Sequence, residues 1–267
     1  MINDALRRAR TTALWLASPA ESAWRRLRGK RSLPPLWLRR HTGPVSAFER
    51  SARELGAFLD ELALLRDADR VLDIGCGAGA IVPELAPRLG SAGRYVGFDV
   101  HAPSIRWCRR RYGSDPRFSF VRAEIASVYG SRSGPPVASY RFPLDDGAAD
   151  LILAKSVFTH LLAADAAHYL SEIHRTLQPG RAAVVTAFLF DASAPELAAV
   201  SRAFPGADGE GLVRWRSRRR PEAAVAYEKS VFFRMVETAG LRVVWMSAGF
   251  FPGAAVPKGQ DTLLLGY

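Results

Sequence analysis

The chain has 267 residues, of which 48% are hydrophobic and 24% charged, so it is long enough to bury a full core without disulfides or a structural metal. Its two cysteines, Cys76 and Cys108, exclude a disulfide framework, and no apolar run approaches the ~20 residues that a membrane span requires. The net charge is +11, yet residues 1–40 alone contribute +8, because they hold ten Arg or Lys and two acids, so the remainder is nearly neutral.

A basic N-terminal extension, residues 1–44, precedes the first strong periodic pattern. Apolar residues from Leu6 to Leu16 recur at helical spacing among arginines, which permits an amphipathic helix on an anionic membrane surface. We favour instead an arm that packs over the rest of the chain, or an unstructured extension. A signal peptide is disfavoured because the apolar stretch over 13–17 is short, so we expect a cytoplasmic protein, with peripheral membrane contact through residues 1–40 as the alternative.

Alternating helix and strand patterns begin at residue 48. Apolar residues at helical spacing predict helices over 48–65, 80–89, 103–111 and 164–177. Short apolar runs bounded by turn residues predict strands over 70–74, 94–99, 118–122, 149–154 and 182–190, with a loop over 130–143 and a turn over 178–180. Strands that alternate with helices indicate an α/β fold, in which a mostly parallel sheet carries helices on both faces.

The segment from residue 191 to about 226 interrupts this alternation. It holds Pro195, Pro205 and a basic run over 214–220. We expect an insertion over the carboxyl edge of the sheet, where ligands bind in such folds. The pattern then resumes with a helix over 230–239 and strands over 242–246 and 261–265, so residues 45–267 are predicted to form one domain.

The strongest local signal is the stretch VLDIGCGAG over residues 71–79. A strand runs into Gly75, Gly77 and Gly79, whose backbone freedom lets a ligand approach the main chain. Dinucleotide-binding enzymes use a related loop with different glycine spacing. Asp73 would repel a pyrophosphate but suits a ligand with an ammonium and a sulfonium group, namely S-adenosylmethionine; a capping or strand-end acid is the alternative.

Acids also follow the next two strands. Asp99 comes about the ~20 residues after the glycines at which a ribose-binding acid is expected, although a turn Asp is the alternative. Glu124 would face an adenine amino group, with Ile125 offering a backbone N–H and an apolar wall. A surface Glu is almost as good an interpretation of position 124.

At this point the sequence resembles the bacterial class I S-adenosylmethionine-dependent methyltransferases of the methyltransferase-domain type. The resemblance covers roughly residues 45–265 and rests on six stretches in the family's order: VLDIGCGAG (71–79), YVGFDVHAPSIRWCRRR (95–111), FVRAEI (120–125), DLILAKSVFTHL (150–161), YLSEIHRTLQPGRAAVVTAF (169–188) and ETAGLRVV (237–244). It implies a Rossmann-like, three-layer α/β/α fold. Its seven-stranded, mostly parallel sheet would have an antiparallel last strand, here GQDTLLL over 259–265.

The resemblance also implies a cofactor and its site. The cofactor is S-adenosylmethionine, and the expected contacts are Asp73, Gly75, Cys76, Gly77, Gly79, Asp99, Val100, Glu124, Ile125, Ala154 and Lys155. Glu124 stands where the family more often has Asp.

The acceptor chemistry requires a further group. A hydroxyl acceptor needs a base, whereas an amine needs only to be neutral. His160 follows the strand over 149–154, at the edge where substrate is expected, and its pKa suits proton removal near neutrality. We name His160 as the candidate general base, with a loop-ordering histidine as the alternative. Tyr227, Glu228 and Asp191 are weaker candidates for the pocket, and a helix-start role is the simpler interpretation of Glu228.

Missing motifs narrow the acceptor. The residues 154–157, AKSV, stand where adenine-N6 enzymes carry Asn-Pro-Pro-Tyr, and neither cysteine is placed to attack a pyrimidine ring. No pattern of acids or histidines suggests a metal site. We therefore predict a metal-independent O- or N-methyltransferase. The FTHL stretch (158–161) resembles that of enzymes that tailor polysaccharides or secondary metabolites, and this resemblance implies a small-molecule or glycan acceptor.

Other functions stay open. The arginines of the extension and of residues 214–220 permit an RNA or other nucleic-acid substrate, but the near-neutral body and the lack of interleaved aromatics disfavour it. A non-catalytic or membrane-associated cofactor-binding protein is a second alternative. A NAD-dependent enzyme is disfavoured by Asp73 and by the glycine spacing.

Overall fold

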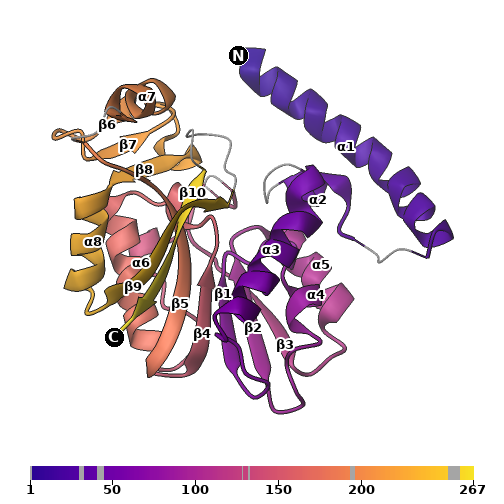
Figure 1. Cartoon of the computed structure of the whole chain (residues 1–267). Coiled ribbons are helices and arrows are strands. Elements are labelled where there is room, and N and C mark those ends of the chain that lie inside the picture. The colour runs from indigo at the N-terminus through magenta and orange to yellow at the C-terminus, as the bar shows by residue number, and fades with distance from the viewer. Residues whose placement is uncertain are drawn as a thin grey trace.

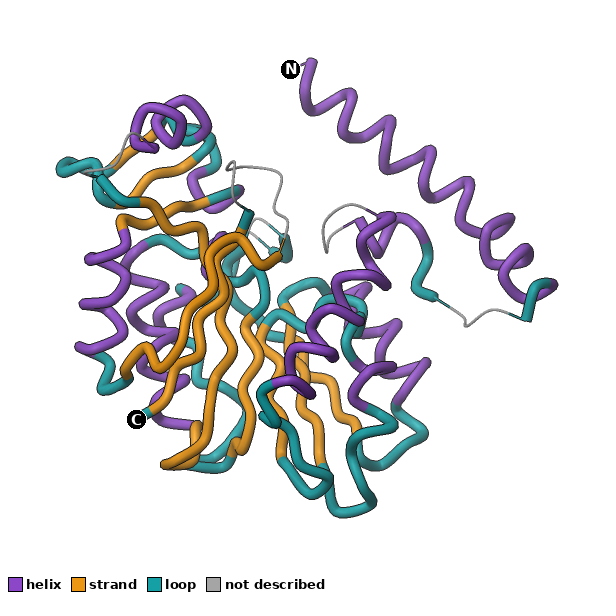
Figure 2. Tube along the Cα trace, in the orientation of Figure 1, coloured by secondary structure: helices purple, strands orange, loops and turns teal. Residues whose placement is uncertain are grey.

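The computed structural model describes residues 2–29, 33–40, 45–127, 129–131, 133–192, 196–251 and 259–267. A central sheet carries helices on both faces, and the N-terminal helix crosses over one shoulder of the molecule (Figures 1 and 2). The predicted α/β fold is confirmed, because the strands alternate with helices along the chain and form one sheet.

The sheet has the order β3-β2-β1-β4-β5, and its first five strands are parallel. Their bounds are β1 (Arg70–Ile74), β2 (Arg94–Asp99), β3 (Phe118–Arg122), β4 (Ala149–Ala154) and β5 (Leu177–Phe190). Beyond β5, strand β10 (Gln260–Gly266) runs antiparallel to both β5 and β9 (Arg242–Phe251). The expectation of seven strands with a reversed last strand is therefore confirmed for this part of the sheet.

Successive side chains of the central strands point to opposite faces of the sheet, so the protein has two hydrophobic cores, one on each face. Leu151 and Leu153 of β4 pack with α3 (Phe48–Glu61), α4 (Val82–Leu85) and α5 (Ala102–Tyr112), whereas Ile152 packs with α6 (Ala163–Thr176) and α8 (Lys229–Thr238). Both faces of the strand are buried, as expected for a parallel sheet covered on each side.

The order in which the chain adds strands to the sheet reverses at β1. Strands β2 and β3 lie on one side of β1, and β4 returns to its other side. A topological switch of this kind leaves a crevice at the carboxyl ends of the adjacent strands, because the loops after them diverge.

Two predicted elements differ from the structure. The helix expected over 80–89 is shorter: Pro83 lies at its start, α4 ends at Leu85, and turns follow. The turn expected over 178–180 lies inside β5 instead. Between Ala149 and Leu151 the partner strand advances from Leu177 to Ala182, so these residues form a bulge whose Gly180 has a φ of +78°.

The segment between β5 and α8 extends the sheet at its carboxyl edge (Figure 1). It contains α7 (Glu196–Ala203), β6 (Gly206–Ala207), β7 (Val213–Trp215), the short 3-10 helix η5 (Pro221–Ala223) and β8 (Val225–Glu228). Strand β8 runs parallel to the end of β5, and β7 and β6 add antiparallel strands beyond it. This segment therefore forms a wall above the carboxyl edge.

The N-terminal helix α1 (Ile2–Leu27) packs through its polar side. Glu21 pairs with Arg39 of α2 (Leu36–Arg39) at 2.7 Å, and Arg25 pairs with Glu49 of α3 at 2.7 Å. Leu16 and Leu27, in contrast, are 65% and 88% exposed. No helix of the described residues is long and apolar enough to cross a membrane.

Candidate active site

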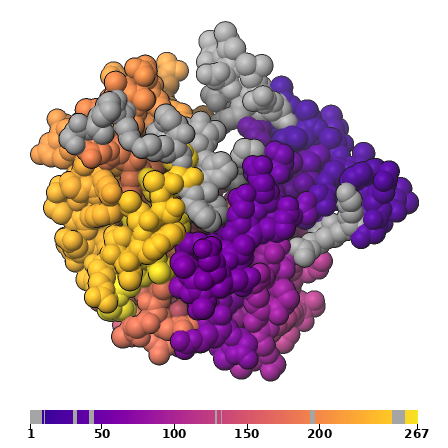
Figure 3. Space-filling model, viewed as in Figure 1, coloured from indigo at the N-terminus to yellow at the C-terminus, as the bar shows by residue number. Residues whose placement is uncertain are grey.

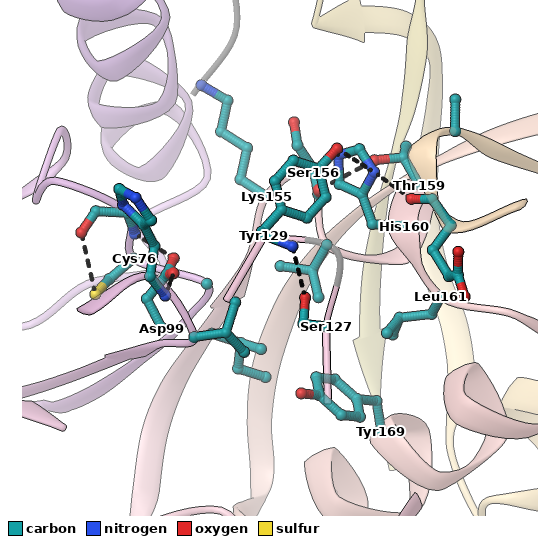
Figure 4. A pocket seen from close by; sticks show the side chains of 18 of the residues that line it. Cys76, Asp99, Ser127, Tyr129, Lys155, Ser156, Thr159, His160, Leu161 and Tyr169 are labelled. Carbon is teal, nitrogen blue, oxygen red and sulfur yellow. Dashed lines mark hydrogen bonds between the residues drawn. The ribbon is translucent and has the colours of Figure 1, made fainter. Parts of the chain in front are cut away.

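A cavity of about 860 Å³ opens at the carboxyl ends of β1, β2 and β4. Its loop side is lined by the glycine loop and Asp99, and its insertion side by Tyr129, His160 and residues of the segment before β8. Figure 4 shows Cys76 and Asp99 on one side of the cavity and His160 on the other, with Tyr129 between them. In the space-filling view, the N-terminal helices and the segment before β8 lie on opposite sides of the upper part of the molecule (Figure 3).

The glycine loop is shaped by positive backbone angles. Gly75 has a φ of +68° and Gly77 a φ of +53°, and both line the cavity. A Cβ at Gly75 would lie 2.7 Å from Val157 Cγ2, so the ends of β1 and β4 approach too closely for a side chain there. Gly79 does not line the cavity; a Cβ there would lie 3.1 Å from Cys108 Sγ, so this glycine allows α5 to pack against the loop.

Asp99 is fixed by two backbone donors. The Gly77 N–H donates to Oδ2 at 2.8 Å, and the His101 N–H donates to Oδ1 at 2.7 Å. An ionised carboxylate has about four acceptor positions, so two backbone donors do not by themselves saturate such a group. The arrangement holds the carboxylate rigidly at the loop side of the cavity.

Asp73 lies below the loop and is only 6% exposed. Burial raises its pKa to about 7, while the hydrogen bond from the Tyr95 hydroxyl, at 2.6 Å, acts in the opposite direction. A Cβ at Gly97 would lie 2.8 Å from Tyr95 Oη, so glycine is required there for this contact. Sequence analysis missed Tyr95, whose only signal was its place two residues before that glycine.

The two cysteine thiols are buried beside the loop. Each lies within weak hydrogen-bond distance of the Gly77 carbonyl oxygen, at 3.8 Å for Cys76 and 3.6 Å for Cys108. Burial raises the pKa of both thiols above the usual range, so both stay protonated. Neither is therefore a nucleophile at neutral pH.

The other predicted cofactor contacts do not all lie at the cavity. Val100 and Ile125 line the cavity. Glu124 does not: its side chain is 76% exposed and pairs with Arg122 at 3.2 Å. Ala154 lies in the core below the site, and the following residue, Lys155, lines the cavity.

Lys155 connects the cavity to α3. Its Nζ donates to the carbonyl oxygen of Ser51 at 3.1 Å, and burial lowers its pKa to about 8. Because Ser51 and Phe48 also line the cavity, this contact places α3 at its edge.

Ser156 is held in a left-handed conformation with a φ of +60°, which is rare for a residue other than glycine. Its N–H donates to Thr186 Oγ1 at 2.7 Å, and its hydroxyl donates to Gln260 Oε1 at 3.0 Å. Thr186 donates to the same Gln260 oxygen at 2.7 Å. These bonds fix the turn after β4, and sequence analysis missed Thr186 and Gln260.

His160 ends the 3-10 helix η4 (Phe158–His160) and lines the insertion side of the cavity. Its Nδ1 lies 3.0 Å from the Glu222 carbonyl oxygen and 3.1 Å from the Tyr129 hydroxyl. A carbonyl only accepts, so Nδ1 carries the proton and Nε2 keeps its lone pair. Burial lowers the pKa of the imidazole, which is therefore neutral at pH 7.

The weaker candidates lie outside the cavity lining. The Tyr227 hydroxyl donates to the Leu161 carbonyl at 2.5 Å in the core. Glu228 caps α8 by accepting from the Val231 N–H at 3.1 Å, which is the helix-start role considered for it. Asp191 is exposed after β5. Residues that do line the cavity but were missed include Tyr129, Asp165, Tyr169 and Glu222.

The groups on the loop side fit S-adenosylmethionine. S-adenosylmethionine carries an ammonium group, ribose hydroxyls and an adenine ring, and this side of the cavity holds the carboxyl groups of Asp73 and Asp99 and the apolar side chains of Val100 and Ile125. Among the described residues, no group of three histidines, cysteines or acids is placed to hold a metal ion.

Comparison with known proteins gives the family. Residues 71–180 match a family described as a methyltransferase domain. The arsenite methyltransferase of Aquipseudomonas alcaligenes is 32% identical over 148 residues, which cover 55% of this chain and 40% of that protein. The chain spans between 29% and 47% of the length of the first four curated relatives that it matches.

Solved structures show the same fold. A SAM-dependent methyltransferase from Aquifex aeolicus has a TM-score of 0.54 at 17% identity, covering 87% of this chain and 98% of that chain. The 1,6-didemethyltoxoflavin-N1-methyltransferase of Burkholderia thailandensis, solved with 1,6-didemethyltoxoflavin and S-adenosylhomocysteine, has a TM-score of 0.55 at 18% identity, covering 84% and 82%. With the glycine loop and the sheet order, the family match identifies residues 71–180 as part of a class I S-adenosylmethionine-dependent methyltransferase domain.

Proposed function

We propose that this protein transfers a methyl group from S-adenosylmethionine to a hydroxyl or amine of a small molecule or glycan, without a metal. The observation that carries the proposal is one cavity that joins the glycine loop to a neutral histidine. The names of the Aquipseudomonas and Burkholderia proteins, an arsenite methyltransferase and a 1,6-didemethyltoxoflavin-N1-methyltransferase, support a small acceptor.

The loop side would hold the cofactor through residues of this chain. Asp99 would accept hydrogen bonds from the ribose hydroxyls, and Asp73 would face the ammonium group. Val100 and Ile125 would cover the adenine. When bound, the cofactor supplies an electrophilic methyl group on sulfur, and much of the catalysis then comes from aligning the acceptor with it.

His160 is proposed as the general base for a hydroxyl acceptor. Its Nε2 would accept the acceptor proton, while the Glu222 carbonyl, which accepts from Nδ1–H, would stabilise the resulting imidazolium. Tyr129, whose hydroxyl lies within 3.5 Å of both ring nitrogens, would orient the ring. An amine acceptor would need no base, so the His160→Gln variant distinguishes the two acceptor classes.

Calorimetric titration of the full chain with S-adenosylmethionine, and with NADH for comparison, tests the cofactor assignment. We expect binding of the methyl donor alone. A folded sample that fails to bind the donor would overturn the proposed function and leave the loop to another ligand. Tight, steeply salt-dependent RNA binding would favour the nucleic-acid alternative instead.

We also propose that α1 contacts an anionic membrane surface. Its polar side faces α2 and α3, whereas Leu16, Trp24 and Leu27 are exposed. The basic residues of the extension complement anionic lipid headgroups.

Sedimentation with vesicles of phosphatidylcholine and phosphatidylglycerol, against phosphatidylcholine alone, tests this contact. Burial of a leucine is worth about 1.5–3 kcal/mol, so Leu27→Glu should weaken vesicle binding roughly tenfold or more. Val244→Glu, at an exposed apolar position on β9, is the matched control. Equal sedimentation of wild type and Leu27→Glu with the vesicles would argue against the membrane contact. So would a monomer–dimer equilibrium in the absence of vesicles that Leu27→Glu abolishes.

A further inference from the structure

Three arginines from one short segment reach the cavity. Arg216, Arg219 and Arg220, between β7 and η5, line it on the insertion side. Arg218, in the same segment, does not line it. The structure therefore separates the arginines that line the cavity from Arg218, whereas the sequence shows only that the whole run is basic.

Arg216 and Arg219 are available to a ligand. Both are exposed, and within the described part of the chain neither forms an ion pair with an acid. The Arg216 guanidinium lies over the Phe204 ring at 5.8 Å, and its backbone N–H donates to the Ala224 carbonyl at 3.0 Å. Arg214, by contrast, donates through Nε to the Phe204 carbonyl at 3.1 Å.

The arginines lie beside the proposed base. The charge of Arg216 is one of the causes that lower the pKa of His160, after burial. The Glu222 carbonyl that faces His160 Nδ1 belongs to η5, which directly follows the arginine run. A ligand group held by these arginines would therefore place its neighbouring atoms close to His160.

The charges around this part of the cavity decide which ligand it fits. The lining acids on the insertion side are Asp165 and Glu222, and burial, followed by the charge of Glu222, raises the pKa of Asp165. Three guanidinium groups outnumber these two carboxylates. A guanidinium matches a carboxylate or phosphate through paired hydrogen bonds, whereas a cationic ligand would be repelled.

We propose that the methyl acceptor carries an oxyanion, a carboxylate or a phosphate, which Arg216 and Arg219 bind while its nucleophile faces His160. This inference rests on the proposed function and adds the substrate class. Arg216 and Arg219 would then determine specificity, because they touch a part of the acceptor remote from the transferred methyl group.

Binding of simple probes to the full chain with S-adenosylhomocysteine tests the site. Benzoate and phenyl phosphate carry the two oxyanions, and benzamide is the neutral counterpart. We expect the oxyanions to bind at least about tenfold more tightly than benzamide, and Arg216→Gln or Arg219→Gln to remove about tenfold of that affinity. Arg218→Gln, in the same segment, should leave it unchanged. The preferred probe of the two tells whether the group is a carboxylate or a phosphate.

Several outcomes would overturn the proposal. Equal binding of benzamide and the oxyanions would do so, as would equal losses in Arg216→Gln and Arg218→Gln. Tight RNA binding that all three arginine variants weaken alike would assign the run to a nucleic-acid surface instead. Binding of S-adenosylhomocysteine, measured on the same samples, reports separately on the proposed function: it should persist in every arginine variant.

Discussion

Replacing Asp99 by alanine removes the carboxylate that the Gly77 and His101 N–H groups hold at the cavity. In the proposed complex this carboxylate accepts two ribose hydroxyls. A hydrogen bond to a charged group contributes about 1.5–3 kcal/mol, so losing two at the lower value costs about 3 kcal/mol. Since 1.4 kcal/mol corresponds to a factor of ten, the Kd for S-adenosylmethionine should rise roughly 100-fold.

Glu124→Ala is the matched control for this prediction. Both positions were expected from the sequence to contact the cofactor, but Glu124 is exposed, pairs with Arg122 and lies outside the cavity lining. Titration calorimetry should therefore give an affinity within about twofold of wild type for Glu124→Ala. Thermal unfolding of each variant checks that the fold persists. A loss below about threefold for Asp99→Ala, or equal losses for both variants, would refute the assignment of the ribose site.

Further predictions concern the supporting contacts. Gly97→Ala places a methyl group against the Tyr95 hydroxyl, so it should lower the free energy of unfolding, measured by urea titration, by about 1–3 kcal/mol. The control is Gly209→Ala, whose added methyl group meets no atom within 4 Å and should change the free energy of unfolding little. Burial lowers the pKa of His160, so its NMR titration midpoint should lie below 6.5. The free energy of unfolding should then fall as pH drops from about 6.5 to the folded-state pKa, because the unfolded imidazole takes up a proton before the folded one does; a midpoint above 6.5 contradicts this. Burial raises the pKa of Asp73 to about 7, so ionisation of this carboxyl lowers the stability of the folded protein. The free energy of unfolding of Asp73→Asn, relative to wild type, should therefore rise by roughly 2–4 kcal/mol between about pH 4 and pH 7. A difference that stays constant across that range would show that Asp73 ionises freely.

The strands could be predicted because their signals are local. Apolar runs bounded by turn residues gave β1 to β4 with the bounds that the structure shows. Periodicity was less reliable where pairing decides the outcome: the bulge at 178–180 depends on how β5 aligns with β4, which no local pattern encodes. The same applies to α4, which ends after one turn although its apolar residues continue to Leu89.

The residues of the site also differ in whether local sequence signals could predict them. Asp73, Asp99 and Lys155 come at or directly after strands, and parallel strands bring their carboxyl ends to one edge, so their meeting could be expected. Tyr129 and Asp165 reach the cavity from a loop and from the first turn of a helix. Their positions depend on the paths of long connections, and sequence spacing carries little information about those paths.

The position of β10 has a consequence for how the protein is made. This strand lies between β5 and β9, and all other strands of the sheet precede it in the sequence. During synthesis the sheet therefore keeps a gap beside β5 until the ribosome has passed residue 266. Gln260, which accepts from Ser156 and Thr186, arrives with the same strand. A nascent chain that still lacks this strand therefore has no Gln260 to hold Ser156, and the turn after β4 that lines the cavity is not yet fixed by these two hydrogen bonds.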